Sequence, residues 1–300
     1  YFQNVPTTAL DLALWMESDR MGHLLGVVTQ ERLDEQRGVV QNEKRQGENR
    51  PQGKLWETVM RGSFPVGHPY HWLPIGSMED LNAASLDDVK EWFRTYYGAA
   101  NAVLVLAGDI DVPTAREKAQ RFFGHIPAGP ALTRPGEWIA ARTESKRAVM
   151  YDQVSQEYWY RFWNIPPVGT ADADLLEIAG HILGGGKTSR LYERLVYRDR
   201  LADSASAGPS AFEIAGIFSM TAAVKNGVDP ARVEAAMQEE LGRFIAKGPT
   251  KEEMERARTA LRSDFLKGLE RIGGFGGKAD VLAACEVFEG DPGCYRRSLQ

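Results

Sequence analysis

The sequence predicts an α+β fold with two related domains, each a mostly antiparallel or mixed sheet with helices packed on one face. Predicted strands come in pairs and predicted helices also come in pairs, which favours this class over a doubly wound parallel sheet. A chain of 300 residues, 43% of them hydrophobic, is long enough to bury one or two cores. The stretch IPAGPALTRPGEW is rich in proline and glycine and has no apolar period, so it predicts an interdomain linker. The first domain is therefore expected over residues 1–126, the linker over 127–145 and the second domain over 146–300, incomplete at its C-terminal end.

The first domain is predicted to be mainly helical. Leucines recur at helical spacing in TTALDLALWMESDRM, and Thr29 is expected to cap a helix from 30 to 49 that ends before Pro51. Ser85 and Asp88 form a capping box for the segment LDDVKEWFRTYY. Further helices are predicted over 54–61 and 113–123, a loop over 62–76, and a buried strand in NAVLVLAG at 101–108.

The second domain is predicted to alternate paired strands with paired helices. Pro230 opens a helix that reaches Lys247, and Thr250 with Glu253 caps another that runs to about Arg271. Strands are predicted in RAVMYDQV, YWYRFWNI, ADSASAGPS and IAGIFSMTAAV, and helices over 173–183 and 189–197.

Charge and hydropathy exclude two classes of partner. The chain carries 36 lysines and arginines against 41 acids, for a net charge of −5, and it has no basic block. This balance argues against nucleic acid or an anionic membrane as the main partner. No apolar run approaches ~18 residues, so no membrane span is predicted. No signal peptide opens the chain, and because Tyr1 does not look like a natural beginning we expect further residues before it.

Two cysteines, Cys285 and Cys294, lie close together in the sequence and lack the spacing of a metal or redox motif. Free thiols are the default expectation. A small disulfide loop, formed in an oxidising compartment, is the alternative.

The segment GGGKTSRL resembles a phosphate-binding loop, because Gly186, Lys187 and Thr188 supply its GKT end. The position that requires glycine, five residues before Gly186, holds His181, and the preceding LLEIAGHIL has a helical period rather than that of a strand. We therefore expect a glycine-rich turn between helices, with Ser189 as a cap, and no nucleotide hydrolysis.

The five histidines of the chain carry no metal-binding spacing. His68 and His71 are separated by a loop proline, which does not hold two imidazoles on one helical face. His23, His125 and His181 stand alone in the sequence, and there is no H-E-x-x-H, H-x-x-E-H or G-x-S-x-G motif. Each histidine is expected to be a hydrogen-bonded structural residue.

Glu43 is the candidate functional residue that the helical period singles out. Counting back in steps of three and four gives a partly apolar stripe that ends in this acid; its members are Val40, Gln36 and Leu33. One interpretation is a surface glutamate paired with lysine or arginine. The other is a metal ligand that projects inward.

Several blocks of the chain together resemble one protein family. NVPTTALDLALWMESDRMG is followed by QRGVVQNEKRQGENRP and by HPYHWLPIGSMEDLNAASLDDVKEWFRTYYGAANAVLVLAGDID, and LGGGKTSRLYERLVYRDRLA agrees in the second half. In this order the blocks resemble the bacterial branch of the pitrilysin/insulinase family of zinc proteases, and the resemblance covers nearly the whole chain.

The resemblance implies an inverted zincin site. Such enzymes carry H-x-x-E-H on a helix, where two histidines bind zinc and the glutamate is the general base. Glu43 in VVQNE matches the family's third zinc ligand, whereas the motif itself is expected upstream of Tyr1, so this segment contains no catalytic residue. Gln36 stands where relatives often have a glutamate hydrogen-bonded to a zinc ligand, and an amide there removes a negative charge near the metal.

The resemblance also implies a function and partners. We expect a zinc-dependent endopeptidase that cleaves peptides or unfolded polypeptides in a chamber of two halves, of which this chain is one half without its H-x-x-E-H segment. The second half, in the same chain or a separate subunit, and the missing upstream segment are expected partners. A catalytically inactive homologue that serves as a structural or partner subunit is the alternative.

Similar bacterial proteins are often exported, so the periplasm or cell envelope is favoured over the cytoplasm. Arg190 and Tyr192 receive no substrate-binding role.

Overall fold

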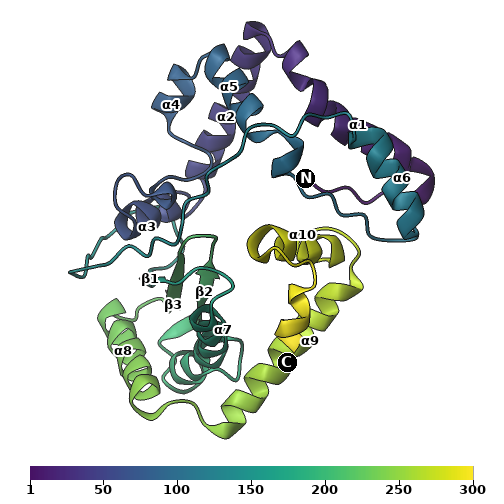
Figure 1. Cartoon of the computed structure of the whole chain (residues 1–300). Coiled ribbons are helices and arrows are strands. Elements are labelled where there is room, and N and C mark those ends of the chain that lie inside the picture. Colours follow the sequence, from purple (N-terminus) through teal and green to yellow (C-terminus); the bar gives the residue numbers. More distant parts are fainter. Residues whose placement is uncertain (300) are drawn as a thin grey trace. The chain divides into compact units, whose positions relative to one another are not determined.

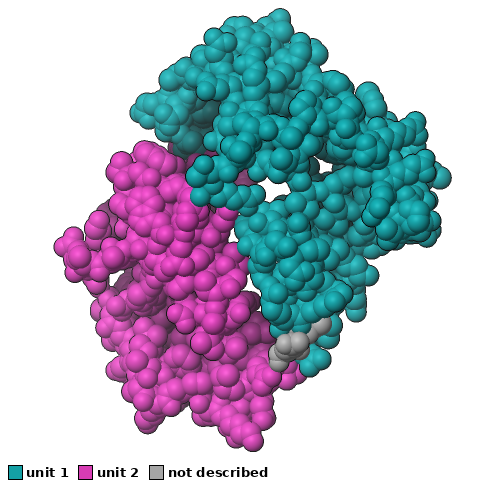
Figure 2. Space-filling view, in the orientation of Figure 1, with its two compact units in different colours: residues 1–44, 75–134, 262–300 teal, residues 45–74, 135–261 magenta. Residues whose placement is uncertain are grey.

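In a computed structural model the α+β class is confirmed, with helices and a small antiparallel sheet (Figure 1). The structure describes residues 1–299. The chain divides into two compact units (Figure 2). Unit 1 contains residues 1–44, 75–134 and those from 262 on, and unit 2 contains residues 45–74 and 135–261.

The sheet lies in unit 2 and has three strands in the order β1-β3-β2. Both neighbours of β3 run antiparallel to it, so that Thr221 lies opposite Tyr160 on one side and Ser206 on the other. The register of β2 shifts between Ala202 and Ser204. The strands are β1 (Tyr158–Ile165), β2 (Ala202–Ala211) and β3 (Gly216–Val224).

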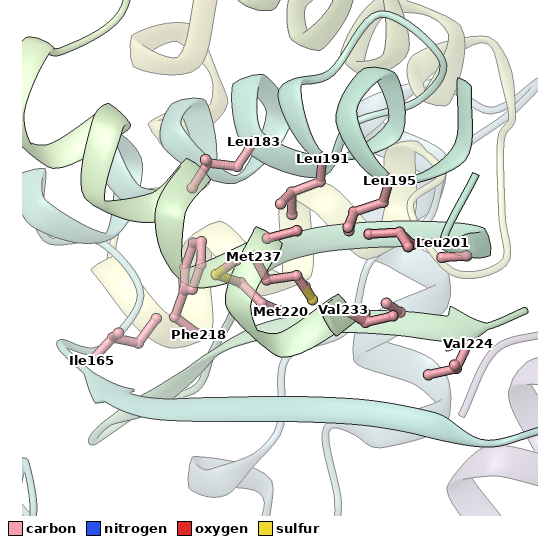
Figure 3. Close-up of a cluster of buried hydrophobic side chains, with 13 residues drawn as sticks. Ile165, Leu183, Leu191, Leu195, Leu201, Phe218, Met220, Val224, Val233 and Met237 are labelled. Atoms are coloured by element: carbon pink, nitrogen blue, oxygen red, sulfur yellow. The ribbon is translucent and has the colours of Figure 1, made fainter. Parts of the chain in front are cut away.

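One face of the sheet packs against helices to form the larger core of unit 2 (Figure 3). Alternate residues of β3 point into it because successive side chains of a strand point to opposite faces. The helices that cover this face are α7 (Ala171–Gly184), a π-helix (Tyr192–Arg198) and α8 (Pro230–Lys247). Its buried side chains include Leu183, Leu191, Leu195, Phe218, Met220, Val224, Val233 and Met237.

The other face of β3 belongs to a second, smaller core. Ile217 packs there with Val59 and Met60 of α3 (Leu55–Ser63), and with Phe64, the residue after that helix. The central strand is therefore buried on both sides, which explains why its sequence is almost continuously apolar.

The loop after α3 is fixed by His68, whose side chain is 0% exposed. Its Nε2 bonds the carbonyl oxygen of Trp138 at 2.9 Å, and its Nδ1 accepts the backbone N–H of Tyr70 at 3.0 Å. Because a carbonyl can only accept, Nε2 carries the proton and the imidazole is neutral. The Phe64 ring stacks on the imidazole at 4.4 Å, and the Tyr70 hydroxyl oxygen accepts from the N–H of Ile214 at 3.2 Å. His68 thus joins its loop to the segment at Trp138, as expected for a structural histidine, and Tyr70 joins the same loop to Ile214.

The regular secondary structure among the described residues of unit 1 is helical. Local signals in the sequence predicted where several of these helices begin. The Arg32 N–H bonds Thr29 Oγ1 at 3.3 Å, and Ser85 with Asp88 forms the predicted capping box. The α-helices are α1 (Leu10–His23), α2 (Gln30–Glu48), α4 (Met78–Ala83), α5 (Leu86–Tyr96), α6 (Val112–Phe123), α9 (Lys251–Glu270) and α10 (Lys278–Glu289), with α2 and α9 each extending into unit 2. Short 3-10 turns are Thr7–Ala9, Leu24–Val27, Pro69–His71, Ala99–Asn101 and Cys294–Leu299.

Two predicted strands are wrong. Residues 101–108 form no strand, and Val103 and Leu104 are 42% and 45% exposed. Residues 147–154 are likewise irregular, with Tyr151 96% exposed. A strand needs a neighbour that accepts its N–H groups, and within residues 1–299 neither segment pairs with one.

The cysteine prediction also needs correction. Cys285 and Cys294 form a disulfide with a Cα–Cα distance of 5.4 Å, so the default expectation of free thiols was wrong.

Among the described helices, none combines the length and apolar character that crossing a bilayer requires.

Replacing His68 tests its structural role. His68→Leu leaves the Trp138 carbonyl and the Tyr70 N–H without partners, so we expect a loss of about 2–4 kcal/mol in the free energy of unfolding. Urea denaturation measures this loss, and hydrogen exchange of residues 64–74 should accelerate. His181→Gln, at a half-buried histidine of α7, serves as the control. A His68→Leu protein as stable as the control would contradict the assigned role.

Candidate functional site

Helix α2 carries the two site residues that the sequence predicted, and its orientation is set by contacts within unit 1. Arg37 donates to the carbonyl oxygens of Leu81, Asn82 and Ala84, the last at 2.9 Å, where α4 ends. Gln41 Nε2 donates to Asn82 Oδ1 at 2.7 Å. Because both side chains bind the same short segment, they fix which way α2 is rotated.

Gln36 and Glu43 lie on a different face of α2. They are seven residues apart, close to two helical turns, so they share a face that points roughly away from the Arg37 and Gln41 contacts. Both side chains are exposed. Within residues 1–299, neither forms a side-chain hydrogen bond or ion pair, and the surface interpretation of Glu43 therefore lacks its expected lysine or arginine partner.

The described residues around Glu43 do not by themselves fit a zinc ion. Structural and catalytic zinc sites use three or four protein ligands. Among residues 1–299, no group of three or more histidine, cysteine, aspartate or glutamate side chains is placed to hold a metal. Glu43 offers one carboxylate, and no reaction step through a metal follows from this chain alone.

The glycine-rich turn at 185–189 has no phosphate-loop geometry. It follows helix α7 rather than a strand, which confirms the sequence prediction. Gly186 adopts a φ of +92°, a conformation that favours glycine. Ser189 differs from its predicted role as a cap, because its hydroxyl donates to the Gly186 carbonyl at 2.7 Å instead of accepting a helix N–H.

Arg190, directly after this turn, makes the principal ion pair of the region. Its guanidinium donates to both carboxylate oxygens of Glu253, each at 2.7 Å, and to the Gly248 carbonyl at 3.0 Å. Glu253 also accepts the Thr250 N–H at 2.7 Å in the predicted cap of α9. Hydrogen bonding from Arg190 holds the pKa of Glu253 below its usual range, and the same contact raises the pKa of Arg190. The carboxylate that pairs with Arg190 lies 63 residues away in the sequence.

Two histidines that the sequence treated as isolated lie together. The Nε2 atoms of His23 and His125 are 3.3 Å apart although the residues are separated by 102 positions. No local pattern reports a contact of this range, so the sequence did not reveal that the two lie together. Their contact agrees with the expectation that each is hydrogen-bonded. His71 behaves as predicted, with its Nδ1 bonded to the Phe64 carbonyl at 2.8 Å.

Comparison with known proteins gives a consistent family relationship. The family model described as "Peptidase M16 inactive domain" matches residues 83–261. The zinc protease PqqE of Helicobacter pylori is 26% identical over 295 residues, which cover 96% of this chain and 65% of PqqE. The non-peptidase homolog YmxG of the same organism is 25% identical over 200 residues, which cover 66% of this chain and 44% of YmxG. The chain thus spans less than two thirds of the length of these curated relatives.

Solved structures share the fold. A protease from Helicobacter pylori superposes with a TM-score of 0.85 at 24% identity, covering 99% of this chain and 71% of that one. Pitrilysin gives a TM-score of 0.72 at 15% identity, covering 95% of this chain and 31% of its own. At these identities the likeness establishes the architecture alone.

The Arg190–Glu253 pair generates a test with a defined pH dependence. The folded state favours the glutamate anion, so the stabilisation is present above the ordinary glutamate pKa of about 4.3 and is lost as pH falls through the lower folded pKa. We expect Glu253→Gln to cost about 2 kcal/mol at pH 7 and to flatten the fall in stability below about pH 4.

Urea denaturation at several pH values measures both effects. Glu255→Gln is the matched control, because this exposed acid is 4.0 Å from Lys251 and such surface pairs contribute less than about 1 kcal/mol. Equal stability of the two variants at pH 7 would show that the Arg190 pair contributes nothing.

Proposed function

Because this chain belongs to the peptidase M16 family, through the domain described as inactive, we propose that it is one half of a zinc-dependent endopeptidase. The observation that carries the proposal is the environment of Glu43. Helix α2 is capped by Thr29 and is held against the end of α4 by Arg37. It presents the Glu43 carboxylate to solvent, without a partner among the described residues. An anchored and unpaired acid is what a shared metal site requires of one of its ligands.

Glu43 would supply one of three protein ligands. The two imidazoles and the general base are proposed to come from an H-x-x-E-H segment that precedes Tyr1 in a longer protein. Gln36 lies seven residues before Glu43 on the same face of α2. It would hydrogen-bond one of the zinc ligands without binding the metal itself. Zinc bound in such sites polarises water for attack on a peptide carbonyl.

Peptides or unfolded polypeptides are the proposed substrates. Such a substrate would bind as an extended strand along the edge of a sheet. Backbone hydrogen bonds would then provide the affinity, with little dependence on the substrate's sequence. Residues 1–6 lie outside any helix or strand and are exposed, so they are free to lie next to such an edge. A second peptidase half, from the same polypeptide or a separate subunit, would close the chamber.

A specific observation favours a second candidate. YmxG of Helicobacter pylori is a non-peptidase homolog, and it matches 66% of this chain. A catalytically inactive partner subunit of a peptidase heterodimer would keep the fold and lose the metal. The residues before Tyr1 discriminate, because an intact H-x-x-E-H favours the enzyme and a degenerate one favours the partner.

Domain limits and cellular location form part of the same proposal. One of the passages between the two compact units, at 134 to 135, lies within the proposed linker, 127–145, although residues 45–74 cluster with the second unit and those from 262 on with the first. We propose 1–126 as the zinc-side domain and 146–300 as the structural domain.

The disulfide of Cys285 with Cys294 supports the periplasm or cell envelope over the cytoplasm, because such bonds persist in oxidising compartments.

Glu43→Ala tests the proposed function in a protein that includes the residues before Tyr1. Loss of one of three ligands is expected to reduce bound zinc to well below one per chain and to lower kcat/KM for a quenched fluorescent peptide by more than about a hundredfold. Mass spectrometry of metals and peptide cleavage are the measurements.

Glu35→Ala is the matched control, because Glu35 is also an exposed acid of α2 and lies one residue from Gln36. It should leave both quantities unchanged. If Glu43→Ala behaves like Glu35→Ala, Glu43 is not a ligand. If the unaltered protein binds no zinc and cleaves nothing, the partner-subunit candidate takes its place.

A further inference from the structure

A small cavity in unit 1 lies where α1 meets α6 and the turn that follows α6. The two helices lie side by side (Figure 1). The cavity has a volume of about 190 Å³, and its lining includes His23, His125, Asp19 and Arg121. None of these residues belongs to the Glu43 face of α2, so the cavity is separate from the site described above.

Two imidazoles converge at this cavity. His23 ends α1 and His125 follows α6, and their rings lie 17° from parallel with centroids 5.4 Å apart. The two Nε2 atoms are 3.3 Å apart, and both side chains are exposed to solvent. One Nε2 donates a hydrogen bond to the other.

The nitrogen separation is also what one tetrahedral metal ion requires. Zinc–imidazole bonds of about 2.0–2.1 Å at the tetrahedral angle place two nitrogens about 3.3–3.4 Å apart. A right angle, as in square-planar or octahedral sites, would place them about 2.8–3.0 Å apart. The 3.3 Å between His23 and His125 is therefore compatible with both nitrogens binding one tetrahedral ion.

Asp19 supplies a negative charge to the same cavity. It lies four residues before His23, so the two side chains share one face of α1. Its carboxylate has no hydrogen bond or ion pair with the rest of the described chain, 1–299. Because no three ligands are yet in place within those residues, Asp19 would reach the ion by side-chain rotation or through a water.

Arg121, the positively charged side chain in the lining of the cavity, is engaged elsewhere. Its Nη1 lies 3.6 Å from Asp11, and its guanidinium lies 5.1 Å from the centre of the Phe122 ring. These two contacts offset part of the repulsion that Arg121 would exert on a bound cation.

The backbone around the two histidines is held closely. A Cβ on Gly22 would lie 3.2 Å from Cγ1 of buried Ile126 and 3.8 Å from Nε2 of His125, so glycine permits this approach of α1 to the turn. Lys118 of α6 forms an ion pair with Asp11 of α1. The imidazoles are thus brought together by the packing of the two helices rather than by a flexible loop alone.

We propose that His23 and His125 bind a single zinc ion, with Asp19 and water completing its coordination, and that the ion links α1 to the turn after α6. The inference does not rest on the proposed peptidase activity, because none of these residues is assigned to it. The site takes a divalent ion that prefers imidazole ligands and tetrahedral geometry.

Cobalt(II) is the probe, because its visible absorption reports tetrahedral coordination. The 300-residue chain, prepared without a histidine tag, is titrated with cobalt and then with zinc as competitor. We expect one saturable site with a tetrahedral spectrum that zinc abolishes, and a rise in Tm with zinc. His23→Gln and His125→Gln should each remove the spectrum, and Asp19→Asn should weaken binding by about tenfold.

One control variant distinguishes this site from metal binding elsewhere in the chain. His181→Gln removes a histidine of α7 and should leave binding unchanged. Folding of each variant is checked by circular dichroism.

Absence of a tetrahedral spectrum in the unaltered chain would show that His23 and His125 form a hydrogen bond only. Binding that persists in both histidine variants would place the metal at a different site. Either result overturns the proposal.

Discussion

The central strand of the sheet, β3, must satisfy two neighbouring strands and two hydrophobic cores with the same nine residues. Phe218, Met220 and Val224 face the core under α7 and α8, while Ile217 faces the smaller core beside α3. A shift of one residue in register would exchange these two sets. The rest of unit 2 follows from this strand, since β1, β2 and the helices on both faces are positioned by contact with it.

His68 extends the same constraint to the irregular segments. A buried imidazole that donates on one side and accepts on the other ties the loop after α3 to Trp138, and Tyr70 ties it to the segment just before β3. Arg190 has a similar role elsewhere in unit 2, where it joins the glycine-rich turn to the start of α9. In each case a polar side chain replaces the hydrogen bonds that regular structure would provide.

Elements governed by neighbouring residues could be predicted from the sequence, whereas those governed by distant partners could not. The caps at Thr29, at Ser85 and at Thr250 depend on contacts three residues away, and all three occur. The apolar runs at 101–108 and 147–154 have strand composition, yet pairing requires a neighbour that composition does not reveal.

The same distinction applies to the functional residues. The position of Glu43 was accessible because helical spacing and the resemblance to the pitrilysin family both single it out. Its lack of a partner was not accessible, because it depends on how Arg37 and Gln41 orient α2 against α4. The His23–His125 pair was missed entirely, since only the packing of α1 on α6 brings residues 102 positions apart together.

The central claim is that Glu43 belongs to a metal site shared with residues outside this chain. An anomalous difference map at the zinc absorption edge, from crystals of the protein with its preceding residues, tests it most directly. The account predicts a peak about 2.0–2.2 Å from a carboxylate oxygen of Glu43, with two imidazole nitrogens completing the protein ligands. A map of that protein with no peak near Glu43, or with a zinc ion whose ligands exclude it, would contradict the account.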